Sequence, residues 1–188
     1  MTVREVTGPV ELVGERVVLR ELREEDWQAV HRYASDPEVC RFMMWGPNTE
    51  EESKAHVRRA LETSQLRPRR TFNLAVSLKD SGEVVGCCAL VISKAEHREG
   101  HIGYSLTRVY WGRGYASEAA KLLVKFGFEA LGLHRIFATC DPENRASARV
   151  LEKAGMQLEG CMRSHVFVKG RWRNSLLFAI LEQDVRPG

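Results

Sequence analysis

The sequence predicts a mixed α/β fold, in which a mostly antiparallel sheet of about seven strands carries helices on both faces. Two pairs of strand-like segments are joined by short polar turns, at residues 79–82 and 169–170, and such turns connect antiparallel hairpins. Between the hairpins, residues 100–154 run strand, helix, strand, helix, an order that requires some parallel pairing. Because the 188 residues contain neither repeats nor a linker, we expect one domain, residues 1–188, with its core at about 15–182.

The N-terminal third predicts one strand and two helices. Residues 17–22 are rich in Val and Leu and predict the first strand. Residues 24–35 predict a helix because their apolar positions recur at helical spacing. A second helix is expected over residues 49–66, since Thr49 and Glu52 have the spacing of a capping box.

The middle of the chain predicts three strands and an amphipathic helix. Residues 72–78 and 84–92 are expected to pair as a hairpin, and residues 100–106 predict the fourth strand. The stretch 110–131 carries a helix with one apolar stripe and charges on the opposite side. The stripe consists of Ala116, Ala119, Ala120, Leu123, Gly127, Ala130 and Leu131.

The C-terminal third predicts three strands and one helix. Residues 135–140 form a strand, and a helix over residues 144–154 is expected to stop at Gly155. Residues 158–168 and 172–181 then form the last hairpin.

Bulk composition excludes several classes of protein. The chain is 44% hydrophobic and 28% charged, as globular rather than disordered domains are. No apolar run approaches the roughly 18 residues of a membrane span, and the first residues lack a signal-peptide pattern, so we expect a cytoplasmic location and no membrane partner. A net charge of +3 is too small to indicate nucleic-acid binding. Five cysteines, without C-x-x-C spacing, argue against a disulfide framework and a structural metal.

A glycine-containing segment joins the fourth strand to the amphipathic helix: Trp111-Gly112-Arg113-Gly114-Tyr115-Ala116. Glycines let the backbone approach a ligand, and the first N–H groups of a helix lack intrahelical partners. Together with the helix dipole they make a site for phosphate or pyrophosphate. Ser117 breaks a dinucleotide-binding fingerprint, and a P-loop is absent. On these residues alone, a tight turn without a ligand stays equally open.

Two segments resemble motifs of the GNAT superfamily of N-acetyltransferases. Residues 113–119 resemble its coenzyme A loop, and with the preceding Trp-Gly they look like its ribosomal-protein N-terminal acetyltransferase branch. Residues 141–156 resemble that branch's N-x-x-S-x-x-[VL]-L-x-K-x-G-[FM] segment. Residues 15–20 and 102–106 are similar too, so the resemblance covers nearly the whole chain. It departs at Trp111, where the superfamily has Gln or Arg, although Trp is usual in this branch.

The resemblance implies the GNAT acyl-CoA N-acyltransferase fold, an N-acetyltransferase activity, and acetyl-coenzyme A (acetyl-CoA) as donor without a metal. The loop amides would hold the pyrophosphate, the end of the fourth strand would pair with the pantetheine arm, and Asn144 would bind that arm from the other side. Arginines, Arg145 among them, would surround the phosphates. The expected coenzyme-binding residues are Leu106, Thr107, Arg108, Gly112, Arg113, Gly114, Tyr115, Ala116, Ser117, Asn144 and Arg149.

The same resemblance supplies the catalytic candidates. Ser147 is expected to be the general acid that protonates the departing thiolate. Read without the resemblance, Ser147 is a first-turn serine and Asn144 an ordinary N-cap. His101 stands where the branch often has Glu and is a candidate base, the alternative being an exposed strand histidine without a role. Tyr104 lies on the opposite face of that strand and is expected to be a core residue.

Two further residues are candidates for acceptor binding. Glu99 shares its strand face with His101. Trp45 lies in an apolar loop between the first two helices, next to the acidic run 50–52, and is expected either to pack on the core or to cover the acceptor. Glu118 is expected to pair with Lys121 one helical turn away, outside the site.

The acceptor is expected to be a primary amine, either a peptide N-terminus or a small molecule. At pH 7 an α-amine with pKa near 7.8 costs about 1 kcal/mol to deprotonate, whereas a lysine costs roughly 4–5 kcal/mol. An α-amine therefore needs only a water-linked base. An aminoglycoside or other drug acetyltransferase, and a non-catalytic acetyl-CoA sensor, remain the alternatives. The protein is expected to be a monomer or a homodimer that binds no nucleic acid.

Overall fold

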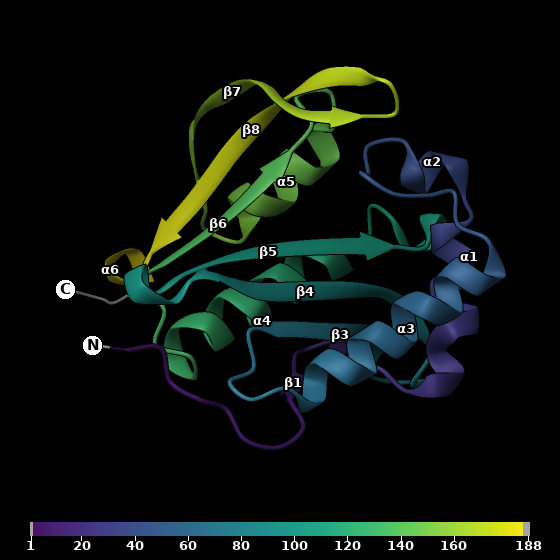
Figure 1. Ribbon diagram of the computed structural model, residues 1–188, viewed down its shortest axis with the longest axis horizontal. Coiled ribbons are helices and arrows are strands. Elements are labelled where there is room, and N and C mark those ends of the chain that lie inside the picture. The colour runs from purple at the N-terminus through teal and green to yellow at the C-terminus, as the bar shows by residue number, and fades with distance from the viewer. Residues whose placement is uncertain (1, 186–188) are drawn as a thin grey trace.

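The structure, a computed structural model that describes residues 2–185, contains an eight-stranded sheet (Figure 1). The strands lie side by side in the order β1-β2-β3-β4-β5-β6-β8-β7. Only β5 and β6 pair in parallel among the described strands. The mixed, mostly antiparallel sheet is thus confirmed, with eight strands against about seven expected. The strands are β1 (Glu11–Val13), β2 (Val17–Glu21), β3 (Thr71–Leu78), β4 (Val84–Lys94), β5 (Glu99–Leu106), β6 (Arg135–Cys140), β7 (Gln157–Val168) and β8 (Arg171–Leu181).

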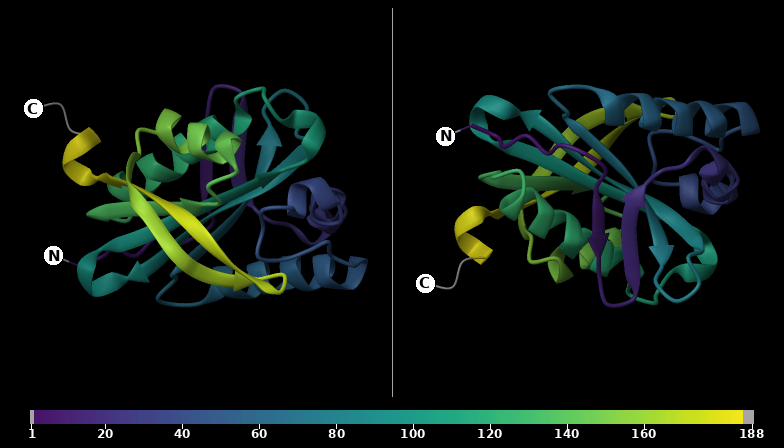
Figure 2. Two further views of the ribbon diagram at one scale, coloured as in Figure 1. Left: turned by 90° about the horizontal axis from the view of Figure 1, so that it is seen from above. Right: turned by 90° about the horizontal axis from the view of Figure 1, so that it is seen from below.

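Helices cover both faces of the sheet, as the views from above and below show (Figure 2). Helices α4 and α5 pack on one face, and α1 and α3 pack on the other. The helices are α1 (Trp27–Ala34), α2 (Pro37–Cys40), α3 (Glu50–Gln65), α4 (Tyr115–Glu129), α5 (Arg145–Lys153) and α6 (Glu182–Val185). Short 3₁₀ turns are η1 (Glu24–Asp26), η2 (Ala95–His97) and η3 (Arg108–Tyr110).

The predicted stripe of α4 forms the centre of the larger core. Leu123 is fully buried, and Phe126 meets Phe72 of β3 edge-on with ring centroids 5.1 Å apart. Gly127 brings the helix unusually close to the sheet, because a Cβ there would lie 2.5 Å from Cδ1 of Ile136. This close packing fixes the direction of α4 and therefore the place of its N-terminus.

Three short elements lie outside the sequence-based expectations, the strand β1 and the helices α2 and α6. In α2, Pro37 occupies the first turn and the Asp36 side chain accepts a hydrogen bond from the Glu38 N–H at 2.9 Å. Proline at this position and an aspartate N-cap both favour a helix start. Four residues are too few for a periodic pattern, so α2 gives no periodic signal in the sequence.

The sheet opens between β5 and β6. Their parallel pairing covers only Glu99–His101 against Arg135–Phe137, although the two strands run on to Leu106 and Cys140. Beyond His101 the described strands no longer pair with each other, and the gap between them widens toward the N-termini of α4 and α5 (Figure 1). Some of the predicted site residues line the resulting opening, among them Leu106, Asn144 and Ser147.

Within residues 2–185 there is no helix long and apolar enough to cross a membrane. The same residues contain no group of three or more His, Cys, Asp or Glu side chains arranged to hold a metal ion. All five cysteines are free thiols.

Candidate active site

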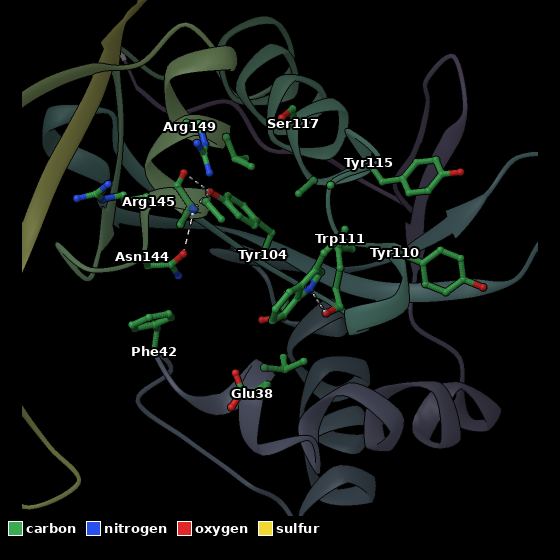
Figure 3. A pocket seen from close by; sticks show the side chains of 18 of the residues that line it. Glu38, Phe42, Tyr104, Tyr110, Trp111, Tyr115, Ser117, Asn144, Arg145 and Arg149 are labelled. Carbon is green, nitrogen blue, oxygen red and sulfur yellow. Dashed lines mark hydrogen bonds between the residues drawn. The ribbon is translucent and has the colours of Figure 1, made fainter.

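A cavity of about 570 Å³ occupies the opening between β5 and β6. Its walls come from the end of β5, the glycine segment and first turn of α4, the first turns of α5, and the segment that includes α2 (Figure 3). The polar and charged residues that line it are Glu38, Arg41, Tyr104, Ser105, Tyr110, Tyr115, Ser117, Glu143, Asn144, Arg145, Ser147, Arg149 and Lys153.

The glycine segment lines this cavity with the backbone of Gly112 and Gly114 and with the side chains of Trp111 and Tyr115 (Figure 3). Gly112 and Gly114 adopt φ values of +73° and +87°, a region that L-residues avoid. Gly114 is the N-cap of α4 and provides no side-chain cap, so the first N–H groups of the helix are left for another acceptor. Gly114, Ala116 and Ser117 all line the cavity. An N-terminus of this kind is suited to an anion.

A second helix N-terminus faces the same space. Asn144 caps α5, its Oδ1 accepting the Ser147 N–H at 3.0 Å, so the N-cap interpretation is correct as far as it goes. Asn144 also lines the cavity, as do Arg145 and Arg149 (Figure 3). Within the described chain neither arginine pairs with a carboxylate, which leaves both guanidinium groups available to a phosphate-bearing ligand.

Ser147 and Tyr104 form the closest pair of hydroxyl groups in the cavity. Tyr104 Oη lies 2.9 Å from Ser147 Oγ and 3.1 Å from the Ser147 carbonyl oxygen. Burial raises the pKa of Tyr104, although the hydrogen bond with Ser147 acts in the opposite direction, so the phenol is protonated at neutral pH. The sequence pattern placed Tyr104 correctly on the face opposite His101 but missed that its hydroxyl reaches the cavity.

His101 and Glu99 lie on the other face of β5 and do not line the cavity. The His101 ring packs against Phe137, centroid to centroid at 5.5 Å, and its buried Nδ1 has no hydrogen-bond partner among the described residues. Burial lowers the pKa of His101, with Glu99 opposing the shift, so the imidazole is neutral at pH 7. Glu99 forms ion pairs with Lys94 at 3.8 Å and Arg135 at 3.3 Å.

Several other predicted residues do not line the cavity. Arg108 forms an ion pair with Asp36, the N-cap of α2, at 3.1 Å. The Thr107 N–H donates to the Val85 carbonyl at 2.8 Å, and the Arg113 guanidinium lies over the Tyr110 ring. Trp45 contacts the edge of the Tyr33 ring, with centroids 6.2 Å apart. Leu106 does line the cavity, and its carbonyl accepts the Trp111 Nε1–H at 2.8 Å.

The wall opposite α5 comes from α2 and the apolar loop after it, the loop that was expected from the sequence either to pack on the core or to cover the acceptor. Glu38, Phe42 and Met43 line the cavity from this side (Figure 3). Two cations of the β7–β8 hairpin hold the segment: Lys169 Nζ donates to the Cys40 carbonyl and Arg173 Nη1 to the Phe42 carbonyl, each at 2.7 Å. This wall therefore depends on contacts between segments about 130 residues apart.

Comparison with known proteins identifies the class of this site. The model of the acetyltransferase (GNAT) domain matches residues 16–157, which include the glycine segment, Tyr104 and Ser147. The chain belongs to the GNAT family and is an N-acetyltransferase. The resemblance noted from the two motifs is thereby confirmed. Use of acetyl-CoA as donor is supported by this membership.

Individual relatives cover almost the whole chain. "Uncharacterized N-acetyltransferase YnaD" from Bacillus subtilis is 35% identical over 92% of this chain and 98% of its own length. A solved acetyltransferase of the GNAT family from Bacillus anthracis is 35% identical, with a TM-score of 0.83 over 93% of this chain and 99% of that one.

Two relatives from Escherichia coli have names that specify an acceptor. "Spermidine N(1)-acetyltransferase" is 28% identical over 89% of this chain and 87% of its own. "[Ribosomal protein uS5]-alanine N-acetyltransferase" is 24% identical over 95% of this chain and 94% of its own. One is named for a polyamine and the other for a protein N-terminus.

Proposed function

We propose that this enzyme transfers the acetyl group of acetyl-CoA to a single primary amine of low basicity, a peptide N-terminus or a small molecule with an amine of similar pKa. The observation that carries the proposal is the Tyr104–Ser147 hydroxyl pair, which lies in one cavity with two helix N-termini. The helix ends suit the phosphates of the donor, and the hydroxyl pair suits a proton transfer.

The residues present fit coenzyme A by the chemistry of their donor groups. Backbone N–H groups over Gly112–Ser117 would bind the pyrophosphate, and the unpaired arginines Arg145 and Arg149 would add positive charge. A Cβ on Gly112 would meet nothing within 4 Å, so the backbone faces open space there. The unpaired edge of β5 up to Leu106, together with the Asn144 amide, would bind the pantetheine arm. When bound, acetyl-CoA supplies an acetyl thioester as the group to be transferred.

Ser147 is proposed as the general acid. Its Oγ lies in the first turn of α5, where the helix dipole favours negative charge on a neighbouring leaving group. Tyr104 keeps its own proton at neutral pH, so its 2.9 Å hydrogen bond positions the Ser147 hydroxyl, and solvent restores the proton that Ser147 gives to the thiolate. The pair thus supplies one proton at a fixed position on the donor side of the cavity.

His101 is proposed as the base that accepts the amine proton through water. It is neutral at pH 7 and its Nδ1 lacks a partner within the described residues. His101 and Phe137 form the last β5–β6 pair, so His101 lies at the point from which the two strands diverge. A water molecule is required because His101 itself does not line the cavity.

The charges around the cavity favour an acceptor with one positive charge. Two carboxylates line it, Glu38 and Glu143, against four cations, Arg41, Arg145, Arg149 and Lys153. A polyamine or aminoglycoside carries several positive charges, and the excess of cations around the cavity would give it little electrostatic attraction. An α-amine needs about 1 kcal/mol for deprotonation at pH 7, within reach of a water-linked imidazole.

The test is a measurement of free thiol release from acetyl-CoA with a panel of N-terminal peptides, small amines, polyamines and aminoglycosides. We expect peptides or simple amines to support turnover and polycations to support little. The variant Ser147→Ala should lose turnover and keep its affinity for the coenzyme by calorimetry. Turnover restricted to polycations would overturn the acceptor class, and no binding of acetyl-CoA would overturn the whole proposal.

A further inference from the structure

Behind the glycine segment, outside the cavity, Arg16 and Glu118 form an ion pair. Arg16 Nε lies 3.1 Å from Glu118 Oε2, which joins the residue before β2 to the first turn of α4. Glu118 Oε1 also accepts the backbone N–H groups of Arg16 at 2.7 Å and Val17 at 3.1 Å. This set of contacts replaces the Glu118–Lys121 pair expected from the sequence, and it ties the start of α4 to the sheet.

A second nitrogen of the Arg16 guanidinium contacts the glycine segment itself. Arg16 Nη1 donates to the Arg113 carbonyl oxygen at 2.9 Å. In a trans peptide the C=O and the following N–H point in opposite directions. Because Arg16 holds the Arg113 carbonyl on its own side, the N–H of Gly114 is turned to the opposite side. Gly114 lines the cavity, and no described residue accepts a hydrogen bond from its N–H.

The Arg16 side chain is half-exposed, and its guanidinium contacts two residues at the start of α4 besides Glu118. A Cβ added to Gly114 would lie 3.0 Å from Arg16 Nη2, so the guanidinium packs directly against this glycine. The guanidinium carbon also lies 5.1 Å from the centroid of the Tyr115 ring, over the first residue of α4. Since its charge is matched by Glu118, whose side chain is only 15% exposed, Arg16 differs from the unpaired Arg145 and Arg149 that line the cavity.

We propose that Arg16 is a positioning residue for coenzyme binding: the Arg16–Glu118 pair fixes the 113–114 peptide so that its N–H is aimed at the donor's pyrophosphate. This inference rests on the proposed function. The residue acts through the backbone of the glycine segment and touches neither the acetyl group nor the acceptor. Its contribution is therefore confined to donors that carry a pyrophosphate.

The experiment compares acetyl-CoA with S-acetyl-pantetheine, which has the thioester and the arm but no pyrophosphate. For Arg16→Gln we expect the KM for acetyl-CoA to rise about tenfold, the effect of one misdirected hydrogen bond to a charged group, with kcat at saturation unchanged. With S-acetyl-pantetheine, wild type and variant should have equal KM values. Lys125→Gln is the matched control, because it removes a cation from an exposed ion pair with Glu129 on α4, the helix that carries Glu118.

Arg16→Lys keeps the positive charge beside Glu118 but cannot also hold the Arg113 carbonyl, so it should raise the KM for acetyl-CoA while the fold stays intact. An equal rise with both donors would overturn the proposal, since it would show a general disturbance of the site. An unchanged KM for acetyl-CoA in both Arg16 variants would overturn it as well. Failure of the wild-type protein to bind acetyl-CoA is a different result, which contradicts the proposed function itself.

Discussion

The hydroxyl oxygens of Tyr104 and Ser147 lie 2.9 Å apart, although one residue belongs to β5 and the other to the first turn of α5. Tyr104 Oη is also 3.1 Å from the Ser147 carbonyl, which can only accept. If Tyr104 donates to that carbonyl, the serine proton is the one shared between the two hydroxyls. The raised pKa of Tyr104 keeps its proton bound at neutral pH, so the pair holds two protons beside the cavity.

Removing the Ser147 hydroxyl should therefore reduce the rate more than removing the Tyr104 hydroxyl. We expect Ser147→Ala to lower kcat about 10²- to 10³-fold, in the range of general acid catalysis, and Tyr104→Phe to lower it about tenfold. The double variant should be no slower than Ser147→Ala, because Tyr104 acts through the serine. Steady-state rates with saturating acetyl-CoA measure this.

Calorimetric titration with coenzyme A is the control for these variants, and all three should bind like wild type. Multiplicative losses in the double variant would mean that Tyr104 and Ser147 act independently. A Tyr104→Phe rate below that of Ser147→Ala would assign the acid to the tyrosine instead.

The pH dependence of the reaction tests His101. Burial lowers the pKa of its imidazole below the usual value, so the base stays unprotonated at pH 7 and over some range below it. With an α-amine acceptor, kcat/KM should rise with pH toward the amine pKa of about 7.8. His101→Asn should lower kcat/KM about 10- to 100-fold at pH 7. This deficit should shrink above pH 8, because the amine then loses its proton to solvent.

Profiles between pH 6 and 9 for both proteins give this comparison. A deficit that stays constant with pH would show that His101 supports the structure around Phe137, against whose ring it packs, rather than removing a proton.

Some elements follow from the sequence because their signals are local. The capping box of α3 appears as expected, with Thr49 Oγ1 accepting the Glu52 N–H at 3.2 Å and Glu52 Oε2 accepting the Thr49 N–H at 2.8 Å. Within α4 the stripe residues Ala119, Ala120, Leu123 and Gly127 are buried and Ala116 is half-buried, and Gly155 ends α5 with φ +87°. Each of these depends on residues only a few positions apart, so tertiary contacts did not override them.

The features that the sequence did not predict depend on distant partners. Glu118 binds Arg16, 102 positions away, rather than Lys121, because β2 passes the N-terminus of α4. Arg108 lies by Asp36 rather than in the cavity, since the position of α2 depends on the β7–β8 hairpin. Periodicity assigned Tyr104 to the correct face of β5, but it carries no information on which helix covers that face.

A substitution at Gly114 tests the role of the backbone at the start of α4. Gly114→Ala introduces a Cβ at φ +87° and 3.0 Å from Arg16 Nη2. The left-handed backbone alone costs roughly 1–2 kcal/mol, and relief of this strain would turn the N–H groups away from the cavity. We expect the KM for acetyl-CoA to rise at least about tenfold.

Gly82→Ala is the matched control, because Gly82 has φ +73° in the β3–β4 turn and an added Cβ meets nothing within 4 Å. It should lower the melting temperature by a similar amount and leave the KM for acetyl-CoA unchanged. Equal KM values for the Gly114 and Gly82 variants would argue that the glycine segment makes a turn without binding the donor.

The free thiols differ sharply in surroundings, which makes the fold testable by alkylation. Cys40, Cys87, Cys88 and Cys140 are buried, whereas Cys161 is exposed on the edge strand β7. Burial raises the pKa of Cys87 to about 12 and that of Cys140 to about 11, so both remain protonated thiols at pH 8. The thiolate is the reactive form, and a buried thiol is also shielded from the reagent.

Native protein treated with iodoacetamide at pH 8 should therefore take up one equivalent rapidly, and peptide mapping should locate it at Cys161. In denaturant all five cysteines should react. Cys161→Ser should abolish the fast phase without changing turnover, because Cys161 does not line the cavity. Rapid labelling of Cys140 in the native protein would contradict the packing of β6 against α5, and with it the placement of Ser147 beside the open end of the sheet.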